Sequence, residues 1–193
     1  LKPMTTATAT KPDGIAQGLP DLGAYIACLA SYNNGHLYGA WVDLQAASTV
    51  EEVQECIDWV ISTSRSPGAE EYAVHDWSGV PRSISSQEWP DWEEVLTLVG
   101  AIDEHGEAFQ LWHENAPGYN TEPSAFERDY VGQYESGADF AQDYYEERHG
   151  AALEQLQEVT FAIDWEAVWK RGEISQYFWG SQGADGFHVY RSI

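Results

Sequence analysis

Residues 24–43 read AYIACLASYNNGHLYGAWVD, and this stretch predicts how the N-terminal part of the chain folds. The apolar run Tyr25–Leu29 suits a buried β-strand. The triplet Asn33-Asn34-Gly35 is a turn signal, and Gly39–Asp43 has the pattern of a strand that returns beside the first. The stretch therefore predicts a small antiparallel sheet.

A helix is expected directly after these strands. Ser48 or Thr49 can cap it, because each is followed three residues later by a glutamate, Glu51 or Glu52, in capping-box spacing. A third strand at residues 71–75 would complete a small sheet that carries one helix. The apolar residues of the helix follow one another at helical spacing: Val53, Cys56, Ile57, Val60 and Ile61.

The middle of the chain has helical patterns separated by glycine and proline. Residues 81–90 contain two prolines and indicate a loop. A helical pattern starts at Asp91, and a further helical stretch, punctuated by Gly106, continues through Trp112. This part of the chain is therefore predicted to be helical.

The C-terminal part combines helices with a hairpin. Ser136 can cap a helix, with Asp139 at the third position after it. Residues 164–171 predict a short helix. Residues 174–179 and 187–190 flank a glycine-rich turn and predict a closing β-hairpin.

These patterns indicate an α+β protein made of consecutive small units. Residues 1–22 are rich in Thr, Ala, Pro and Gly and lack a periodic apolar pattern, so we expect a flexible N-terminal arm. The units that follow are a small sheet-plus-helix domain at residues 23–80, a helical middle domain at residues 81–122, and a C-terminal α+β domain at residues 123–193.

The net charge is the outlying feature of the composition. The 193 residues include 32 Asp and Glu but only nine Lys and Arg, which gives a formal charge of −23. Duplex DNA carries about one negative charge per 1.7 Å of axis, so 23 charges correspond to roughly 39 Å of duplex. A compact globule of this length has a diameter of roughly 40 Å. An elongated form of the chain could therefore match the linear charge density of DNA, although composition alone does not establish such mimicry.

The carboxylates also occur in long tracts without cations. Ten lie between Arg82 and Arg128, and seven lie between Lys11 and Arg65. Ordinary helices place Lys four residues after Glu and gain roughly 0.2–0.5 kcal/mol, whereas like charges at that spacing cost a similar amount. A sequence that keeps such repulsion indicates a negative field that attracts a positively charged groove, and nucleic-acid-binding clefts have that character.

Other functional classes find little support in the sequence. No apolar run approaches the roughly 18 residues that span a bilayer, and no signal-peptide pattern is present, so we expect a cytoplasmic protein without a membrane partner. The two cysteines fall in apolar patterns and are expected to be buried. The six histidines lack metal-ligand spacing, and nucleophile-elbow, phosphate-loop and dinucleotide motifs are absent. We therefore expect no enzyme activity, no catalytic residues, no cofactor and no metal.

Four segments lie in order along the chain: Tyr25–Gly35 with Leu37, Gly39, Trp41 and Asp43, then Glu70–Gly79, Tyr130–Ala141 and Ile163–Ala167. Together they resemble the ArdA family of antirestriction proteins, which mobile genetic elements carry to protect incoming DNA. The resemblance implies an elongated protein of three small domains that forms a homodimer through its C-terminal part and mimics bent B-form DNA. It also implies that the partner is a type I restriction-modification enzyme, bound at its specificity and methyltransferase subunits, in a bacterial host cell.

On this hypothesis the binding surface consists of carboxylates that imitate phosphates, and no nucleic acid is bound. The candidates are Glu51, Glu55 and Asp58 in the first unit, Glu93, Glu94, Asp103, Glu104 and Glu107 in the second, and Asp139, Asp143, Glu146 and Glu147 in the third.

Three alternatives remain open. The chain could be an acidic interaction protein that sequesters another basic DNA-binding protein, such as a repressor or a nucleoid protein. It could also be a carbohydrate-active enzyme that uses two carboxylates, because nine tryptophans could stack on sugars. Finally, halophilic proteins share the excess of carboxylates and the scarcity of lysine.

Overall fold

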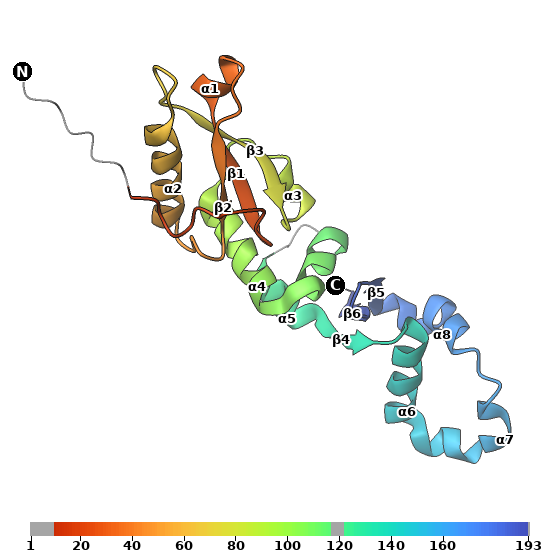
Figure 1. Cartoon of the computed structure of the whole chain (residues 1–193). Helices are drawn as coiled ribbons and strands as arrows, with labels where there is room; N and C mark the ends of the chain where they lie inside the picture. Colours follow the sequence, from red (N-terminus) through yellow and green to blue (C-terminus); the bar gives the residue numbers. More distant parts are fainter. Residues whose placement is uncertain (1–9, 117–121, 193) are drawn as a thin grey trace, which may run out of the picture. The chain divides into compact units, whose positions relative to one another are not determined.

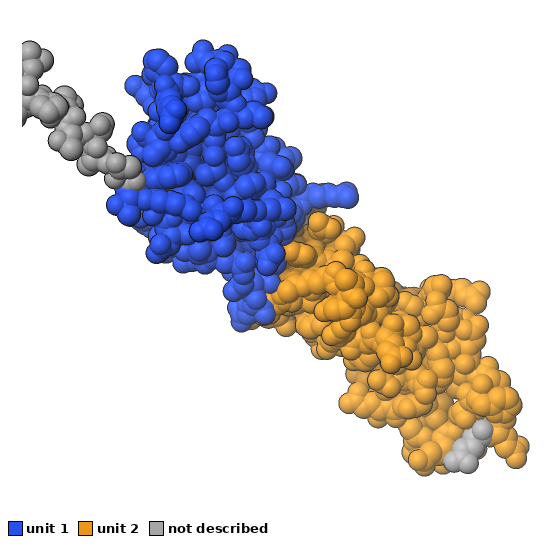
Figure 2. Space-filling model, viewed as in Figure 1, with its two compact units in different colours: residues 1–104 blue, residues 105–193 orange. Residues whose placement is uncertain are grey.

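The computed structural model describes residues 10–116 and 122–192 (Figure 1). In these residues the chain forms eight α-helices, one 3-10 helix and six strands, which make two three-stranded antiparallel sheets. Figure 2 colours the two compact units into which the chain divides, residues 1–104 and residues 105–193. The predictions of a mixed α+β fold and a C-terminal β-hairpin are confirmed.

The first unit is built on β1 (Gly23–Cys28), β2 (Gly39–Asp43) and β3 (Tyr72–Ser78), in the spatial order β2-β1-β3. The predicted pairing of β1 and β2 is present, with Ala24 opposite Val42. Both of these side chains are fully buried. Because residues directly opposite one another share a face of a sheet, they belong to one apolar face.

Helix α2 (Val50–Thr63) lies against β1 and β2. The hydroxyl of Thr49 accepts the backbone N–H of Glu52 at 3.2 Å, and the Glu52 carboxylate accepts the N–H of Thr49 at 3.0 Å. The predicted capping box is therefore confirmed, with Thr49 rather than Ser48 as the cap. The helix buries Val53, Cys56, Ile57 and Val60, and Cys28 of β1 is buried as well.

The segment before β1 is packed on the sheet in its described part. Ile15 forms an antiparallel bridge to β2, and the backbone N–H of Ala16 donates to the Trp41 carbonyl at 2.9 Å. The side chains of Ile15 and Leu22 are buried. The expectation of a flexible arm is wrong for these residues, because two apolar side chains and backbone hydrogen bonds hold the segment on the sheet edge. Residues 1–9 lie outside the described residues.

Two short helices of the first unit were not predicted. Helix α1 (Leu29–Asn33) follows β1 directly, so the strand ends one residue before the predicted end. Helix α3 (Arg82–Ser85) lies inside the stretch that was expected to be a loop, and it buries Ile84. A single buried side chain in a polar segment gives too little periodicity to indicate a helix from sequence.

Helix α4 (Trp92–Asn115) contributes to both compact units. Gly106 interrupts its helical backbone with φ 61° and ψ −144°, close to the boundary that follows Glu104. Buried side chains occur on both sides of this boundary, among them Val95 in the first unit and Phe109 in the second. The expected helical middle domain is thus divided between the two compact units.

The second unit has a sheet with the strand order β4-β6-β5. Ser136 caps α6 by accepting the N–H of Asp139 at 3.2 Å, as predicted. The core contains Phe140, Ile174 and Val189. The elements are α5 (Pro123–Asp129), β4 (Tyr130–Tyr134), α6 (Gly137–Gln155), α7 (Gln157–Thr160), α8 (Trp165–Arg171), the 3-10 helix η1 (Glu173–Gln176), β5 (Phe178–Gln182) and β6 (Phe187–Arg191).

The start of the hairpin differs from the prediction. Residues 174–176 belong to η1, and β5 begins at Phe178. Ile174 is buried in the core, so its apolar character reflects an anchor for η1 and not a strand. Strand β4 and helix α5 were not predicted either.

No helix among the described residues is both long enough and apolar enough to cross a bilayer.

Candidate functional site

Nearly all carboxylates of the chain lie at its surface. Of the 32, all but three are exposed; Asp43 and Glu107 are half-buried and Asp129 is buried. Asp129 forms a two-pronged ion pair with Arg128, with 2.8 Å from Nε to Oδ1 and 3.1 Å from Nη2 to Oδ2. This hydrogen-bonded pairing raises the pKa of Arg128. The exposed carboxylates give the surface of the chain its negative field.

Helix α2 presents the three carboxylates predicted for the first unit on its exposed side. Glu51, Glu55 and Asp58 are exposed, while the opposite side of the helix is buried against the sheet. Gln54 lies one turn before Asp58, and its amide donates to the Asp58 carboxylate at 2.7 Å. The hydrogen bond orients the carboxylate and leaves its charge intact, because the amide is neutral.

Helix α6 repeats this arrangement in the second compact unit. Asp139, Asp143, Glu146 and Glu147 are exposed, and the Gln142 amide donates to Glu146 at 2.7 Å. The helix therefore keeps a row of four carboxylates, of which two accept a hydrogen bond from a neutral side chain: Glu146 from Gln142, and Asp139 from the Ser136 hydroxyl.

One member of this row is paired with a cation. The guanidinium of Arg148 lies 3.6 Å from the Glu147 carboxylate and 3.7 Å from the centre of the Tyr144 ring. Both charged groups are exposed, and such surface ion pairs are weak. The charge of Glu147 is consequently offset in part by its neighbour on the same helix.

Four candidates on α4 lie in the part of the helix that precedes Gly106, two at its start and two at its end. Glu93 and Glu94 occupy the first turn, where a negative charge interacts favourably with the helix dipole. Asp91 precedes them and accepts the N–H of Glu93 at 2.9 Å. Asp103 lies farther along, and its carboxylate accepts a hydrogen bond from the Gln45 side chain. Glu104 follows it and is also exposed.

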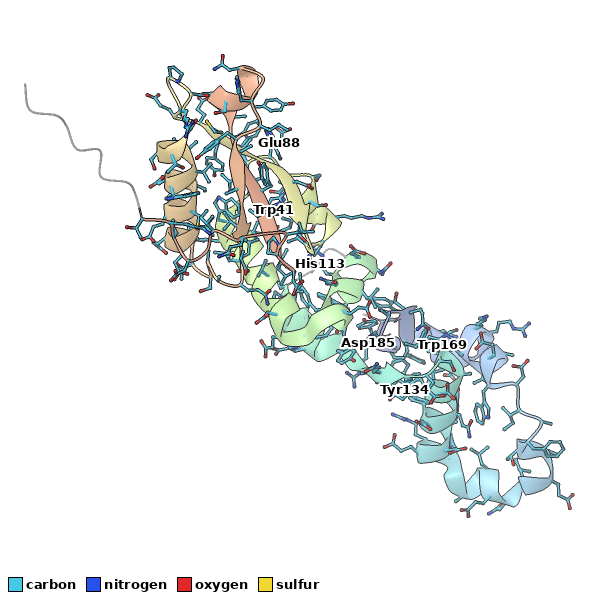
Figure 3. All side chains as sticks on the ribbon, in the orientation of Figure 1. Trp41, Glu88, His113, Tyr134, Trp169 and Asp185 are labelled. Carbon is cyan, nitrogen blue, oxygen red and sulfur yellow. The ribbon has the colours of Figure 1, made fainter. Side chains whose placement is uncertain are left out.

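Glu107 differs from the other candidates because its carboxylate has a structural role. It accepts the backbone N–H groups of Ala184 at 2.7 Å and Asp185 at 3.2 Å, and so holds the turn between β5 and β6. Asp185 of this turn is labelled in Figure 3. It is half-buried. Glu107 was predicted as a phosphate mimic, but it differs from the other candidates because it is half-buried and hydrogen-bonded to the turn, whereas they are exposed.

The glutamines that accompany the acids were not predicted from the sequence. Gln45, Gln54 and Gln142 each donate to a candidate carboxylate. Two of these pairs have the i,i+4 spacing at which glutamine and acid side chains meet on a helix, so that signal was available in the sequence. The pair of Gln45 and Asp103 joins residues 58 positions apart, and no local pattern indicates it.

One group of side chains in the described residues has the composition of a metal site. Donor atoms of Glu107, Asp185 and His188 lie within 4.8 Å of one another. Hydrogen bonds already occupy them, since His188 Nε2 lies 2.8 Å from Asp185 Oδ1 and His188 Nδ1 lies 3.2 Å from the Tyr130 hydroxyl. The bond to His188 lowers the pKa of Asp185. Together with the bonds that Glu107 accepts from Ala184 and Asp185, these contacts hold the hairpin against α4 and β4.

These contacts do not activate the Tyr130 hydroxyl as a nucleophile. Burial, together with the nearby Asp185, raises the pKa of Tyr130, so its hydroxyl stays protonated at neutral pH. His188 is 2% exposed and offers little access to a substrate. Cys56 is also unreactive, because burial and the charges of Glu55 and Glu52 raise its pKa to about 11.

These features define an acidic α+β protein whose helices present exposed carboxylates. The chain belongs to the ArdA family: a family model described as antirestriction protein (ArdA) matches residues 24–185, most of the chain. Membership implies antirestriction function and interaction with restriction enzymes, and ArdA is not a known enzyme family. A search among curated proteins gave no significant match.

Proposed function

We propose that the chain inhibits type I restriction-modification enzymes by mimicking B-form DNA and occupying their DNA-binding groove. The observation that carries the proposal is the exposure of eleven of its twelve candidate carboxylates, the half-buried Glu107 being the exception. The enzyme's specificity and methyltransferase subunits are the proposed partners. Binding would take place in the cytoplasm of a bacterial host and protect incoming mobile DNA.

The spacing of the carboxylates supports this mode of binding. From Glu51 to Asp58, seven residues at 1.5 Å each span roughly 10 Å of helix axis, so the three acids average about 5 Å per charge. From Asp139 to Glu147 the axis length is roughly 12 Å for four acids, or about 4 Å per charge. One strand of DNA carries a phosphate about every 3.4 Å of axis. Helix α6 can therefore present charge nearly as densely as one strand, and α2 at roughly two thirds of that density.

The proposal is tested by competition. The protein is mixed with a purified type I enzyme and its cognate DNA, and cleavage and methylation are followed as the protein is added. We expect both activities to fall, and the apparent affinity to weaken steeply with added salt, because many charges act together. Full cleavage and methylation at several-fold excess of the protein would refute the proposal.

A homodimer formed through the C-terminal part belongs to this proposal. Its support is an apolar stretch near the end of α6, in which Leu156, Val159 and Phe161 are 55%, 56% and 86% exposed. A cavity of about 760 Å³ adjoins it, lined in part by Phe161, Ile163 and Trp165. Exposed apolar side chains grouped in this way are typical of protein interfaces.

Sedimentation at low and high salt tests the dimer. Two chains of charge −23 repel each other, so salt is expected to strengthen association. Replacing Val159 and Phe161 by serine should leave a monomer, whereas replacing exposed Leu19 of the other unit should not. A wild-type monomer at every salt and protein concentration would contradict this part of the proposal.

A further inference from the structure

A groove in the first unit carries side chains that the carboxylate rows do not use. It lies among α1, β3 and the segment between α3 and α4, and has a volume of about 580 Å³. Its lining includes three aromatic side chains, Tyr32, Trp77 and Trp89, together with His75 and Glu88. This combination of rings and a carboxylate differs from the helix faces described above.

The rings of the groove are held in place by their polar atoms. The Trp77 indole N–H donates to the Gln87 carbonyl at 3.1 Å, and the Trp89 indole N–H donates to the Tyr72 carbonyl at 3.1 Å. Tyr32 meets the His75 ring edge-on, with 4.7 Å between the ring centres. The indoles have no polar hydrogen left to satisfy, so any ligand meets their ring surfaces.

Two of these rings remain open to solvent. Trp89 is 65% exposed and Tyr32 is 51% exposed, although both belong to residue types that usually bury most of their surface. Exposed tryptophan and tyrosine side chains are enriched among the residues that dominate binding energy at protein interfaces. The groove therefore has the aromatic anchors of a binding site.

Glu88 supplies the charge of the groove. The backbone N–H of Val74 donates to the Glu88 carbonyl at 2.9 Å, which fixes this residue beside β3 (Figure 3). Glu88 is the one carboxylate among the described residues that line the groove, and it is exposed. Aromatic faces beside a carboxylate attract a flat cation, because the rings present negative quadrupoles and the carboxylate accepts N–H groups.

We propose that this groove binds an arginine side chain of a basic partner protein. A guanidinium is planar, stacks on aromatic rings and donates in a fork to a carboxylate, whereas the strongly hydrated ammonium of lysine does so less well. The groove is large enough to hold the side chain with its flanking backbone. The inference rests on the proposed function for the identity of the partner, but the ligand chemistry follows from the groove alone.

The test uses the full-length protein and short blocked peptides, acetyl-Gly-X-Gly-amide, in which X is arginine, lysine or citrulline. Citrulline has the shape of arginine without its charge. Indole N–H signals are followed by two-dimensional NMR during each titration. We expect the arginine peptide to shift the signals of Trp77 and Trp89 with millimolar affinity, the lysine peptide to bind more weakly, and the citrulline peptide to leave them in place.

Variants separate the groove from the overall charge. Glu88→Gln and Tyr32→Ala should each weaken the arginine peptide roughly two- to fivefold, as expected for one exposed ion pair or one exposed cation–π contact. Glu70→Gln removes an equal charge at a residue that does not line the groove, and it should leave the affinity for the arginine peptide unchanged. Equal binding of arginine and citrulline, or equal loss in Glu70→Gln and Glu88→Gln, would overturn the inference.

The peptide titration and the restriction assay fail independently. If the protein inhibits the enzyme but binds no arginine peptide, the inference that the groove binds arginine is refuted and the proposed function is unaffected. A protein that binds the peptide as expected but does not inhibit the enzyme would refute the proposed function and keep the groove.

Discussion

At the scale of single residues, neighbouring carboxylates of this chain have different roles. Glu51 points its charge to solvent, whereas Glu52 closes the capping box of α2 and accepts three hydrogen bonds from Ser48 and Thr49. Glu107 likewise serves a turn. Charge alone therefore does not identify a phosphate mimic, and the hydrogen-bond partners of each acid decide which ones can serve.

Glu52→Gln is predicted to change how stability depends on pH. The backbone N–H groups of Ser48 and Thr49 lower the pKa of Glu52 from its ordinary value of 4.5. A carboxyl whose pKa is lower in the folded state stabilises the fold above its unfolded pKa, and loses this contribution as pH falls through the folded pKa. We expect urea unfolding to give a larger free energy of unfolding for the wild type than for the variant at pH 6–7. This difference should shrink below about pH 4.5.

The control for this prediction is Glu51→Gln, which removes a charge one residue earlier and leaves the capping box intact. At neutral pH the free energy of unfolding of this control should differ less from the wild-type value than that of Glu52→Gln does. A Glu52→Gln difference that stays constant between pH 3 and pH 7 would contradict the role given to the ionised cap.

At the scale of elements, the helices combine like charges with neutral partners. Gln54 on α2 and Gln142 on α6 each hold an acid one turn later. Lysine at these positions would give ordinary i,i+4 ion pairs and would cancel charge. Glutamine therefore suits a surface that must stay negative.

The double variant Gln54→Lys/Gln142→Lys is predicted to separate folding from binding. New i,i+4 pairs should keep the unfolding free energy within about 0.5 kcal/mol of wild type. Inhibition of the restriction enzyme should weaken, and the slope of log affinity against log salt should fall by roughly one for each added cation. Gln54→Ala/Gln142→Ala, which preserves the net charge, is the control and should keep the slope. Wild-type potency in the lysine variant would argue against the helix faces as binding surfaces.

A pair of glycines in α4 gives a prediction about the backbone. Gly106 has φ 61° and ψ −144°, a conformation essentially restricted to glycine, so Gly106→Ala should lower the unfolding free energy by about 1–3 kcal/mol. Gly100 lies in the same helix, where an added methyl group would meet open space, and Gly100→Ala should raise stability by about 0.5–1 kcal/mol. Urea unfolding measures both, and equal effects would show that the backbone of α4 is not interrupted at Gly106.

The elements also show what the sequence could predict. The caps at Thr49 and Ser136 and the helix faces that follow them depend on residues within a few positions, so local pattern was sufficient. The role of Glu107 depends on backbone groups 77 and 78 residues away, and the docking of Ile15 depends on the edge of β2. Such contacts leave no local periodicity, and for this reason the packed segment before β1 and the structural glutamate were missed.

At the scale of the whole molecule, a charge of −23 opposes folding by self-repulsion. Added salt screens this repulsion, since the Debye length falls from about 10 Å at 0.1 M to about 3 Å at 1 M. We predict that the unfolding temperature rises with the concentration of sodium chloride over this range. For a variant in which Glu51, Glu55, Asp139 and Asp143 are changed to their amides, the unfolding temperature should rise less. Both effects are read in one set of thermal melts.

The same thermal unfolding experiments distinguish a protein that folds despite its charge from a halophilic protein that needs salt to fold. A DNA mimic must fold at low ionic strength, where its attraction for a basic groove is strongest. We therefore expect a cooperative transition already at about 0.05 M salt, followed by a gradual rise in temperature. A chain that is unfolded there and folds only near molar salt would show that its carboxylates serve hydration in brine, and the four-amide variant would then fold at lower salt than wild type.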